Sequence, residues 1–272
     1  MNEERIGFIG VGNMGEALLR GLIGSGLIPP ARIFASDINV EKVCNLSEEL
    51  GINAVESNRK LVLESDIILL AVKPDVIRDV LAEIAPDLAQ PGWCISIAAG
   101  VSTAAIEGLL QSGVPVVRVM PNTPAMVGEG MAAICPGRFA NETHIEKTKE
   151  IFQSVGKAIV VQEKLMDAVT ALSGSGPAFV FLIIEALADA AVQLGLARAD
   201  ATIMAAQTVL GAGKMVIDTG EHPAVLKNKV TSPGGTTAAG LYELERGRVR
   251  AAIIDAIVAA ASRSKQLSSG SN

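Results

Sequence analysis

Residues 5–15 read RIGFIGVGNMG, which joins a short apolar strand to the start of a helix through closely spaced glycines. Gly10, Gly12 and Gly15 have GxGxxG spacing. The first glycine allows a tight turn, the second lets a pyrophosphate approach the backbone, and the third lets helix and strand pack closely. With a strand before it and a helix after it, the stretch predicts a dinucleotide-binding unit. The alternative is a glycine-rich turn that binds nothing.

The composition narrows the class of protein. The chain has 272 residues, of which 49% are hydrophobic, and its formal net charge is −6. Without a basic run, nucleic acid is not an expected partner. Three cysteines lie far apart, and there are only two histidines, so we expect neither disulfides nor a metal site. These features favour a reduced, cytoplasmic compartment.

One apolar run, at residues 177–195, has the length of a membrane span but contains Glu185 and Asp189. We therefore expect a buried or subunit-interface helix and no membrane association. Strand-like sequence from Arg5 onward leaves no room for a signal peptide, which also favours the cytoplasm.

The first half alternates β-branched runs with helix-length segments, which is typical of a mainly parallel sheet in an α/β domain. The predicted strands lie at 5–10, 32–36, 66–72, 94–98, 115–119, 131–135 and 157–161. The predicted helices between them lie at 13–26, 39–51, 75–88 and 142–156.

The second half contains only helix-like segments, bounded by Pro or Gly. Several of them are apolar nearly all round, as a helix between two subunits would be. We predict a Rossmann-like domain at 1–164 and an all-α dimerisation domain at 165–272. The helices are expected at 177–195, 199–220, 223–230, 238–247 and 248–267.

Asp37 ends the predicted second strand about 20 positions after the last glycine of the motif, where a carboxylate holds the adenosine ribose. Such a carboxylate favours NAD and repels the 2′-phosphate of NADP. Ser36, Asn58 and Arg59 could still accommodate a phosphate, although the polarity of a solvated loop is the preferred interpretation of these three residues. The cofactor preference stays open at this point.

Two further segments, AVKP at 71–74 and SIAAG at 96–100, lie at the carboxyl ends of predicted parallel strands, where such sheets bind ligands. Lys73 is either a ribose contact or a surface lysine. The predicted cofactor-binding residues are Gly10, Gly12, Asn13, Met14, Gly15, Ser36, Asp37, Asn58, Ala71, Val72, Lys73, Pro74, Ala98, Ala99, Gly100 and Asn122.

A second candidate site is the stretch TSPGGTT, at residues 231–237, directly before a helix-like segment. A helix N-terminus presents unpaired N–H groups and the positive end of the helix dipole, so hydroxyls and glycines there suit a small anion such as a carboxylate. The alternative is that Thr236 or Thr237 merely caps the helix. The predicted substrate-binding residues are Ser232, Gly234, Gly235, Thr236 and Thr237.

Read together, FIGVGNMG, AVKP, SIAAGV, MPNTPA, LSGSGPAFVF, LGAGKMV, GEHP and LKNKVTSPGGTT resemble the pyrroline-5-carboxylate reductase family, from about Arg5 to Leu267. The resemblance implies reduction of Δ1-pyrroline-5-carboxylate to L-proline with NADPH or NADH. It also implies helical domains that interlock in a homodimer, with rings of dimers as a further possibility. Thr237 would lie close to the ring nitrogen of the substrate as the catalytic residue.

The resemblance is incomplete at one position. The family often has a small hydroxyl residue where this chain has Asp37, which leaves its usual NADPH preference in doubt.

Ser173 and Ser175 either shape the pocket or cap a helix that begins at Pro177.

Two other functions fit parts of the pattern. A β-hydroxyacid dehydrogenase would share the glycine motif and use Lys214 as proton acceptor, but it has no role for the TSPGGTT stretch. A non-catalytic dinucleotide-binding sensor would need no carboxylate site at all.

Overall fold

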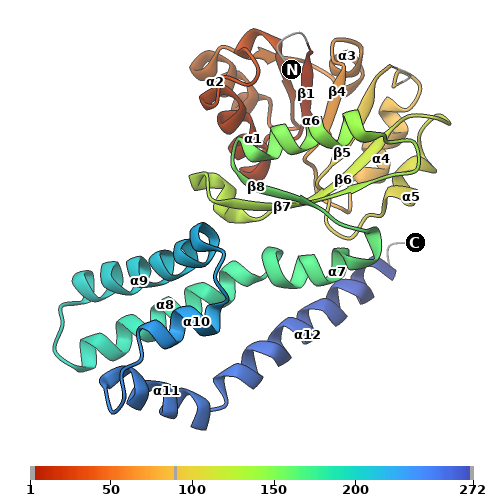
Figure 1. Ribbon diagram of the computed structural model, residues 1–272. Coiled ribbons are helices and arrows are strands. Elements are labelled where there is room, and N and C mark those ends of the chain that lie inside the picture. The colour runs from red at the N-terminus through yellow and green to blue at the C-terminus, as the bar shows by residue number, and fades with distance from the viewer. Residues whose placement is uncertain (1–3, 89–90, 270–272) are drawn as a thin grey trace. The chain divides into compact units, whose positions relative to one another are not determined.

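The computed structural model describes residues 4–88 and 91–269 (Figure 1). By packing, the chain forms two compact units. The first contains the residues up to Ser175 together with the end of the last helix from Ala260, and the second is Gly176–Ala259. The predicted domain boundary after residue 164 stays a prediction, because packing within one chain does not define where a dimerising domain begins.

Unit 1 is built on one sheet of eight strands in the order β3-β2-β1-β4-β5-β6-β7-β8. All neighbouring strands are parallel except β6 and β7, so the predicted mainly parallel sheet is confirmed. The strands are β1 (Ile6–Ile9), β2 (Ile33–Ser36), β3 (Asn53–Ala54), β4 (Ile67–Leu70), β5 (Trp93–Ser96), β6 (Val116–Met120), β7 (Gly130–Pro136) and β8 (Gly156–Val160).

Helices cover both faces of this sheet (Figure 1). Alternate residues of β1 and β4 enter two separate cores, because successive side chains of a strand point to opposite faces. Phe8 and Leu69 pack with helices α1 (Asn13–Gly24), α2 (Val40–Leu50) and α6 (Glu142–Gln153). Ile9 and Leu70 pack with α3 (Asn58–Leu63), α4 (Ile77–Ile84) and α5 (Thr103–Glu107).

Several short elements of unit 1, among them one strand and two helices, were not expected from the sequence. The strand β3 has two residues, and the helices α3 and α5 have six and five. Elements this short contain too few repeats of a hydrophobic pattern to be recognised in a sequence. The first residues of the two helices are defined by side-chain caps instead, since Ser57 and Ser102 accept hydrogen bonds from the first-turn amides of α3 and α5.

The helical continuation of unit 1 corrects one expectation. Instead of starting at Pro177, the helix runs through η3 (Glu163–Leu165), α7 (Met166–Val169) and a π-helical segment at Thr170–Gly174 to α8 (Gly176–Gln193). Ser175 donates its amide to the carbonyl of Thr170, and Ser173 donates its hydroxyl to that of Val169. These serines therefore lie inside a helical run and do not cap a new helix.

Unit 2 is entirely helical in its described residues, as predicted. It contains α8, α9 (Arg198–Thr219), α10 (Pro223–Lys229), α11 (Thr236–Arg246) and most of α12 (Val249–Ser269). Its buried core is small and consists of Ala188, Ala201 and Ala205 between α8 and α9. Large apolar side chains such as Phe181, Leu182 and Ile203 are mostly exposed within the single chain.

One helix among the described residues, Glu163–Gln193, is long and apolar enough to cross a membrane by length and composition alone. Only 11% of its most apolar window is buried within the chain. This is the run for which the sequence favours a subunit interface.

Candidate dinucleotide and anion sites

The glycine motif forms the turn that the sequence predicts. Gly10 has φ +95°, and a Cβ atom there would lie 2.7 Å from the carbonyl oxygen of Ala71. A Cβ atom on Gly15 would collide with the Gly10 carbonyl. Only glycine fits these two positions, which keep α1 close to the ends of β1 and β4.

Gly12 is different, because a Cβ atom there would meet nothing within 4 Å among the described residues. It is the N-cap of α1, and no side chain within the described part of the chain caps that helix. The first-turn amides of α1 thus face an open space beside an exposed glycine. This cradle fits the pyrophosphate of a dinucleotide.

The register of the parallel strands brings the other predicted cofactor residues to the same edge. Ile9 pairs with Ser36 and with Leu70, and Leu70 pairs with Ser96. The segments that follow these strands, including 71–74 and 98–100, therefore start at one level of the sheet. Lys73, Pro74 and Ala99 are exposed there, whereas Ala98 is buried.

The Asp37 carboxylate is tied to the glycine loop. Oδ2 accepts a hydrogen bond of 2.7 Å from the amide of Val11, and Oδ1 accepts one of 2.9 Å from the amide of Asn39. The side chain is half-buried, and each oxygen keeps a further lone pair. Asp37 therefore stands beside the glycine loop at the place where a ribose carboxylate is expected.

The polar residues around Asp37 are engaged with one another. The hydroxyl of Ser36 donates to Oδ1 of Asn58 at 2.8 Å, and Nδ2 of Asn58 donates to Glu83 at 2.8 Å. Arg59 forms a 2.6 Å ion pair with Asp87. A 2′-phosphate at this end of the site would thus compete with Glu83 and Asp87 for the donors of Asn58 and Arg59.

Asn122 connects two elements of unit 1. Its Nδ2 donates to the carbonyl of Ser173 at 3.0 Å, and its Oδ1 accepts from the amide of Met131 at 2.8 Å. The side chain satisfies a carbonyl of the π-helical region, where the ordinary helical ladder is interrupted. This structural role was not expected from the sequence.

In unit 2, the TSPGGTT stretch forms a tight turn before α11. The amide of Gly235 donates to the carbonyl of Ser232 at 3.1 Å, with Pro233 and Gly234 between them and φ +68° at Gly234. Gly235 is the N-cap of α11, and no side chain of the described residues caps the helix. The hydroxyls of Thr236 and Thr237 are within the first turn, so neither threonine is the predicted cap.

This geometry leaves the first amides of α11 available to an anion. Ser232 and Thr236 are exposed and Thr237 is half-buried. Lys214, the proton acceptor that a hydroxyacid dehydrogenase would need, forms a 2.7 Å ion pair with Asp218 on its own helix.

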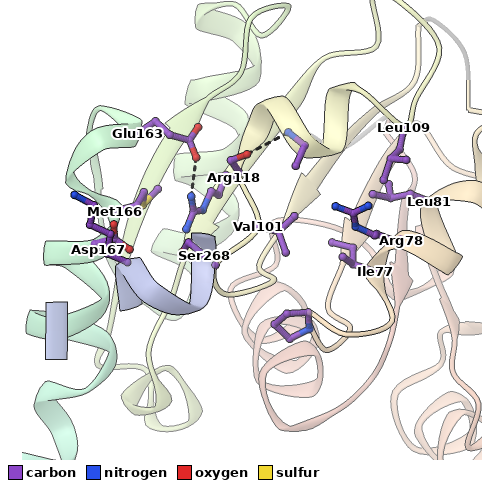
Figure 2. Close-up of a pocket in the computed structure, with 15 residues that line it drawn as sticks. Ile77, Arg78, Leu81, Val101, Leu109, Arg118, Glu163, Met166, Asp167 and Ser268 are labelled. Atoms are coloured by element: carbon purple, nitrogen blue, oxygen red, sulfur yellow. Dashed lines mark hydrogen bonds and ion pairs between the residues drawn. The ribbon is translucent and has the colours of Figure 1, made fainter. Parts of the chain in front are cut away.

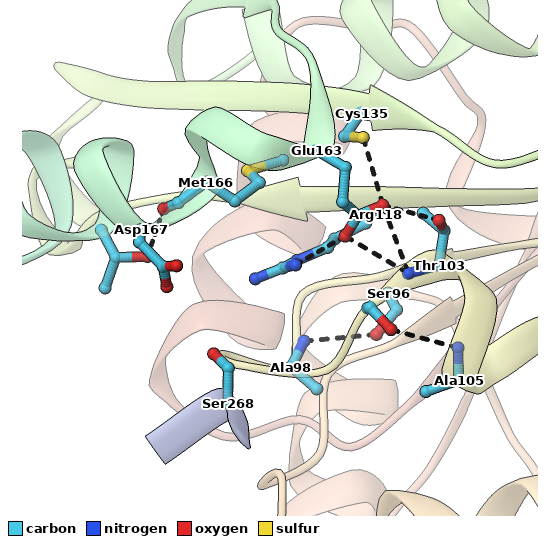
Figure 3. Close-up of polar contacts among 12 residues, drawn as sticks. Ser96, Ala98, Thr103, Ala105, Arg118, Cys135, Glu163, Met166, Asp167 and Ser268 are labelled. Atoms are coloured by element: carbon cyan, nitrogen blue, oxygen red, sulfur yellow. Dashed lines mark hydrogen bonds and ion pairs between the residues drawn. The ribbon is translucent and has the colours of Figure 1, made fainter. Parts of the chain in front are cut away.

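A buried polar cluster in unit 1 was missed by sequence reasoning (Figure 3). Arg118 on β6 donates to Glu163 at 2.6 Å, and the same carboxylate accepts from the hydroxyl of Thr103 at 2.6 Å. The thiol of Cys135 contacts it at 3.4 Å. The available signal was the arginine inside the apolar strand VVRVM, since a buried charge needs a partner.

The cluster sets the protonation of its members. Burial by itself would raise the pKa of Glu163, but the hydrogen bonds from Thr103 and Arg118 and the charge of Arg118 outweigh burial and lower the pKa below its ordinary value. Burial, followed by the nearby Glu163 charge, raises the pKa of Cys135 to about 12. Glu163 is therefore an anion at neutral pH, and the Cys135 thiol stays protonated.

Two family models match the chain. Pyrroline-5-carboxylate reductase dimerisation matches residues 163–267, and NADP oxidoreductase coenzyme F420-dependent matches residues 5–100. The first covers all of unit 2 and the helix with the exposed apolar surface. The second covers the glycine loop and the segments at the carboxyl edge of the sheet.

Similar proteins match over nearly the whole chain. The pyrroline-5-carboxylate reductase of Methanosarcina acetivorans is 48% identical over 98% of this chain and 99% of its own length. The enzyme of that name from Escherichia coli is 44% identical over 98% of this chain and 99% of its length.

Solved structures agree with these relatives. A pyrroline-5-carboxylate reductase from Coxiella burnetii superposes with a TM-score of 0.93 at 39% identity, covering 98% of this chain and 99% of its own. The Plasmodium falciparum enzyme, solved with NADP bound, gives 0.86 at 37% identity and covers 98% and 99% of the two chains. The protein described here is an NAD(P)H-dependent oxidoreductase with a dimerisation domain, and it belongs to the pyrroline-5-carboxylate reductase family.

Proposed function

We propose that this protein reduces Δ1-pyrroline-5-carboxylate to L-proline, the last step of proline biosynthesis, with the TSPGGTT turn as its substrate site. The observation that carries the assignment of this site is the uncapped N-terminus of α11, which follows a turn with three nearby hydroxyls. Ser232, Gly234, Gly235, Thr236 and Thr237 would hold the substrate carboxylate through amides and hydroxyls.

The proposed reaction requires the protein mainly to position the substrate. A protonated cyclic imine is already electrophilic, so its carbon accepts a hydride without a strong general acid. Thr237 would orient the ring nitrogen through its hydroxyl while the neighbouring amides hold the carboxylate. This assignment needs no histidine and no lysine, unlike the hydroxyacid dehydrogenase alternative.

The dinucleotide would bind along the carboxyl edge of the sheet in unit 1. Bound NADH or NADPH supplies the hydride. Gly12 and the first amides of α1 would hold the pyrophosphate, and Asp37 would face the adenosine ribose. The full proposed set is Gly10, Gly12, Asn13, Met14, Gly15, Ser36, Asp37, Asn58, Ala71, Val72, Lys73, Pro74, Ala98, Ala99, Gly100 and Asn122.

The dimerisation domain and the reductase relatives show oligomerisation and a small-molecule substrate, and the relatives support a soluble protein. We infer a cytoplasmic homodimer in which the turn of one subunit serves the dinucleotide of its partner. We further propose that dimers assemble into a ring, which would cover exposed apolar surface that the dimer interface does not bury.

The direct test measures oxidation of NADPH and of NADH by the purified protein with Δ1-pyrroline-5-carboxylate. Thr237→Ala is compared with Thr237→Ser, which keeps the hydroxyl. We expect Thr237→Ala to lower kcat/KM by about 10- to 100-fold, the value of one hydrogen bond to a charged group, with unchanged cofactor affinity. Full turnover by Thr237→Ala, or loss of cofactor affinity alone, would remove the residue from the substrate site.

A further inference from the structure

A cavity of about 270 Å³ lies in unit 1 on the side of the sheet covered by α4 and α5 (Figure 2). Its walls come from α4, from the segment after β5 and from the last turns of α12. It meets the proposed cofactor residues only at Pro74 and Gly100. The glycine loop leads into α1, which packs on the opposite face of the sheet, so this cavity is separate from the pyrophosphate cradle.

Arg118 is the decisive feature of this cavity. It is 6% exposed and lines the cavity from β6. Its Nη1 is paired with Glu163, whereas Nε and Nη2 have no hydrogen-bond partner among the described residues. Figure 2 shows the guanidinium between Glu163 and Ser268. Within the described residues neither nitrogen is a sealed, unsatisfied donor, so both are reachable from the cavity, where an acceptor can bond to them.

The open nitrogens of Arg118 have a geometry that selects the ligand. Nε and Nη2 form one edge of the planar guanidinium, which matches the two oxygens of a carboxylate. The other walls of the cavity include the apolar side chains of Ile77, Leu81, Val101 and Met166. These suit a hydrocarbon body of a few carbon atoms attached to the carboxylate.

The remaining charges favour a monoanion. Arg78 and Lys265 add positive charge to the lining, and Glu163 and Asp167 add negative charge. Together with Arg118 the lining carries a small excess of positive charge. A phosphate dianion would meet the two carboxylates at short range, whereas a carboxylate brings a single charge.

We propose that this cavity binds a small organic carboxylate with an apolar body, held by Nε and Nη2 of Arg118. The lining of the proposed site belongs entirely to unit 1 and includes no residue of the substrate turn, which belongs to unit 2. It gives the protein a second place to bind an organic acid. Because Pro74 and Gly100 lie in its wall, the occupied cavity would be adjacent to the dinucleotide.

The test is calorimetric titration of the full-length protein with cyclopentanecarboxylate. All titrations use a Thr236→Glu background. The introduced carboxylate lies at the exposed start of α11 and repels the probe from the substrate turn. A negative charge at a helix N-terminus also interacts favourably with the helix dipole, so the substitution is compatible with the helix. The uncharged cyclopentanecarboxamide serves as the control ligand. This design separates the cavity from the proposed substrate site.

Two kinds of variant then locate the binding. Arg118→Met combined with Glu163→Gln removes both charges of the pair, so no buried charge is left without a partner. Ser268→Tyr fills the cavity from the last turn of α12 without changing the pair, and Gln266→Tyr is the matched control at an exposed position of the same helix.

We expect one carboxylate per chain, and binding about tenfold weaker or undetectable for the carboxamide, for the pair variant and for Ser268→Tyr. Gln266→Tyr should bind as the background protein does. Absence of binding in the background protein would overturn the proposal, and so would binding by the pair variant and by Ser268→Tyr as tight as that of the background protein. If the pair variant does not fold, the comparison of Ser268→Tyr with Gln266→Tyr decides.

Discussion

The carboxylate of Asp37 accepts a 2.7 Å hydrogen bond from the amide of Val11, which ties the end of β2 to the glycine loop. The residue has two separable effects, one through hydrogen bonding and one through charge. Asn at this position keeps an oxygen acceptor for Val11 and removes the charge that repels a 2′-phosphate.

Asp37→Asn should therefore shift cofactor preference toward NADPH. Removing one charge about 4 Å from a phosphate is worth about 1 kcal/mol in water and about 4 kcal/mol near a protein surface. We expect the ratio of kcat/KM for NADPH to that for NADH to rise by at least about fivefold. Glu41→Gln, an exposed acid in the first turn of α2, is the control, and an unchanged ratio in Asp37→Asn would contradict the role.

The glycine loop allows a second test, since two of its glycines differ in their surroundings. Gly10→Ala forces a Cβ atom at φ +95° against the Ala71 carbonyl, so it should destabilise the fold by about 2 kcal/mol or more. Gly12→Ala has open space and should cost no more than about 1 kcal/mol. Urea unfolding measures both.

Cofactor affinity should respond to Gly12→Ala although the stability of the fold changes little. Gly12→Ala stays folded but places a methyl group where the pyrophosphate approaches, so we expect its NADPH affinity to fall. Fluorescence titration with NADPH measures this effect. Wild-type affinity in folded Gly12→Ala would mean that the pyrophosphate does not bind at this amide.

The Arg118–Glu163 pair predicts a pH dependence of stability. The pKa of Glu163 is depressed in the folded protein, so its contribution is present above the unfolded pKa and is lost as the pH falls through the folded value. Glu163→Gln should lower the free energy of unfolding by about 2 kcal/mol at neutral pH, as expected for lost hydrogen bonds to a charged group.

This difference between wild type and Glu163→Gln should shrink as the pH falls below the ordinary glutamate pKa of about 4.3. Urea unfolding at neutral and at acidic pH measures it. Glu49→Gln is the control, because Glu49 forms a solvent-exposed pair with Arg20, and such pairs contribute little to stability. A difference that is independent of pH would exclude the charge of Glu163 as the cause.

The exposed apolar surface of α8 predicts a change of assembly. Leu182 is 65% exposed in the single chain and belongs to the segment matched by the dimerisation model. Leu182→Glu would bury a charge in the interface, so we expect a monomer in size-exclusion chromatography with light scattering. Leu63→Glu, at an equally exposed position of α3, should leave the oligomer intact.

Much of the fold followed from local sequence pattern. The glycines at 10, 12 and 15, the alternation of strands and helices and the proline–glycine turn at 233–235 each depend on neighbouring residues. Such features have a fixed spacing, because backbone conformation and hydrophobic period are properties of short segments. The sequence by itself therefore determined the fold class and the family, and it predicts the places of the two sites.

The tertiary structure decided the contacts between distant segments. Arg118 and Glu163 are 45 positions apart, and Asp37 and Val11 are 26 apart. Nothing in the spacing of such residues specifies their pairing, since their side chains meet only after β strands and loops are placed side by side. For the same reason, the open edge of the Arg118 guanidinium and the cavity beside it became visible only in the folded chain.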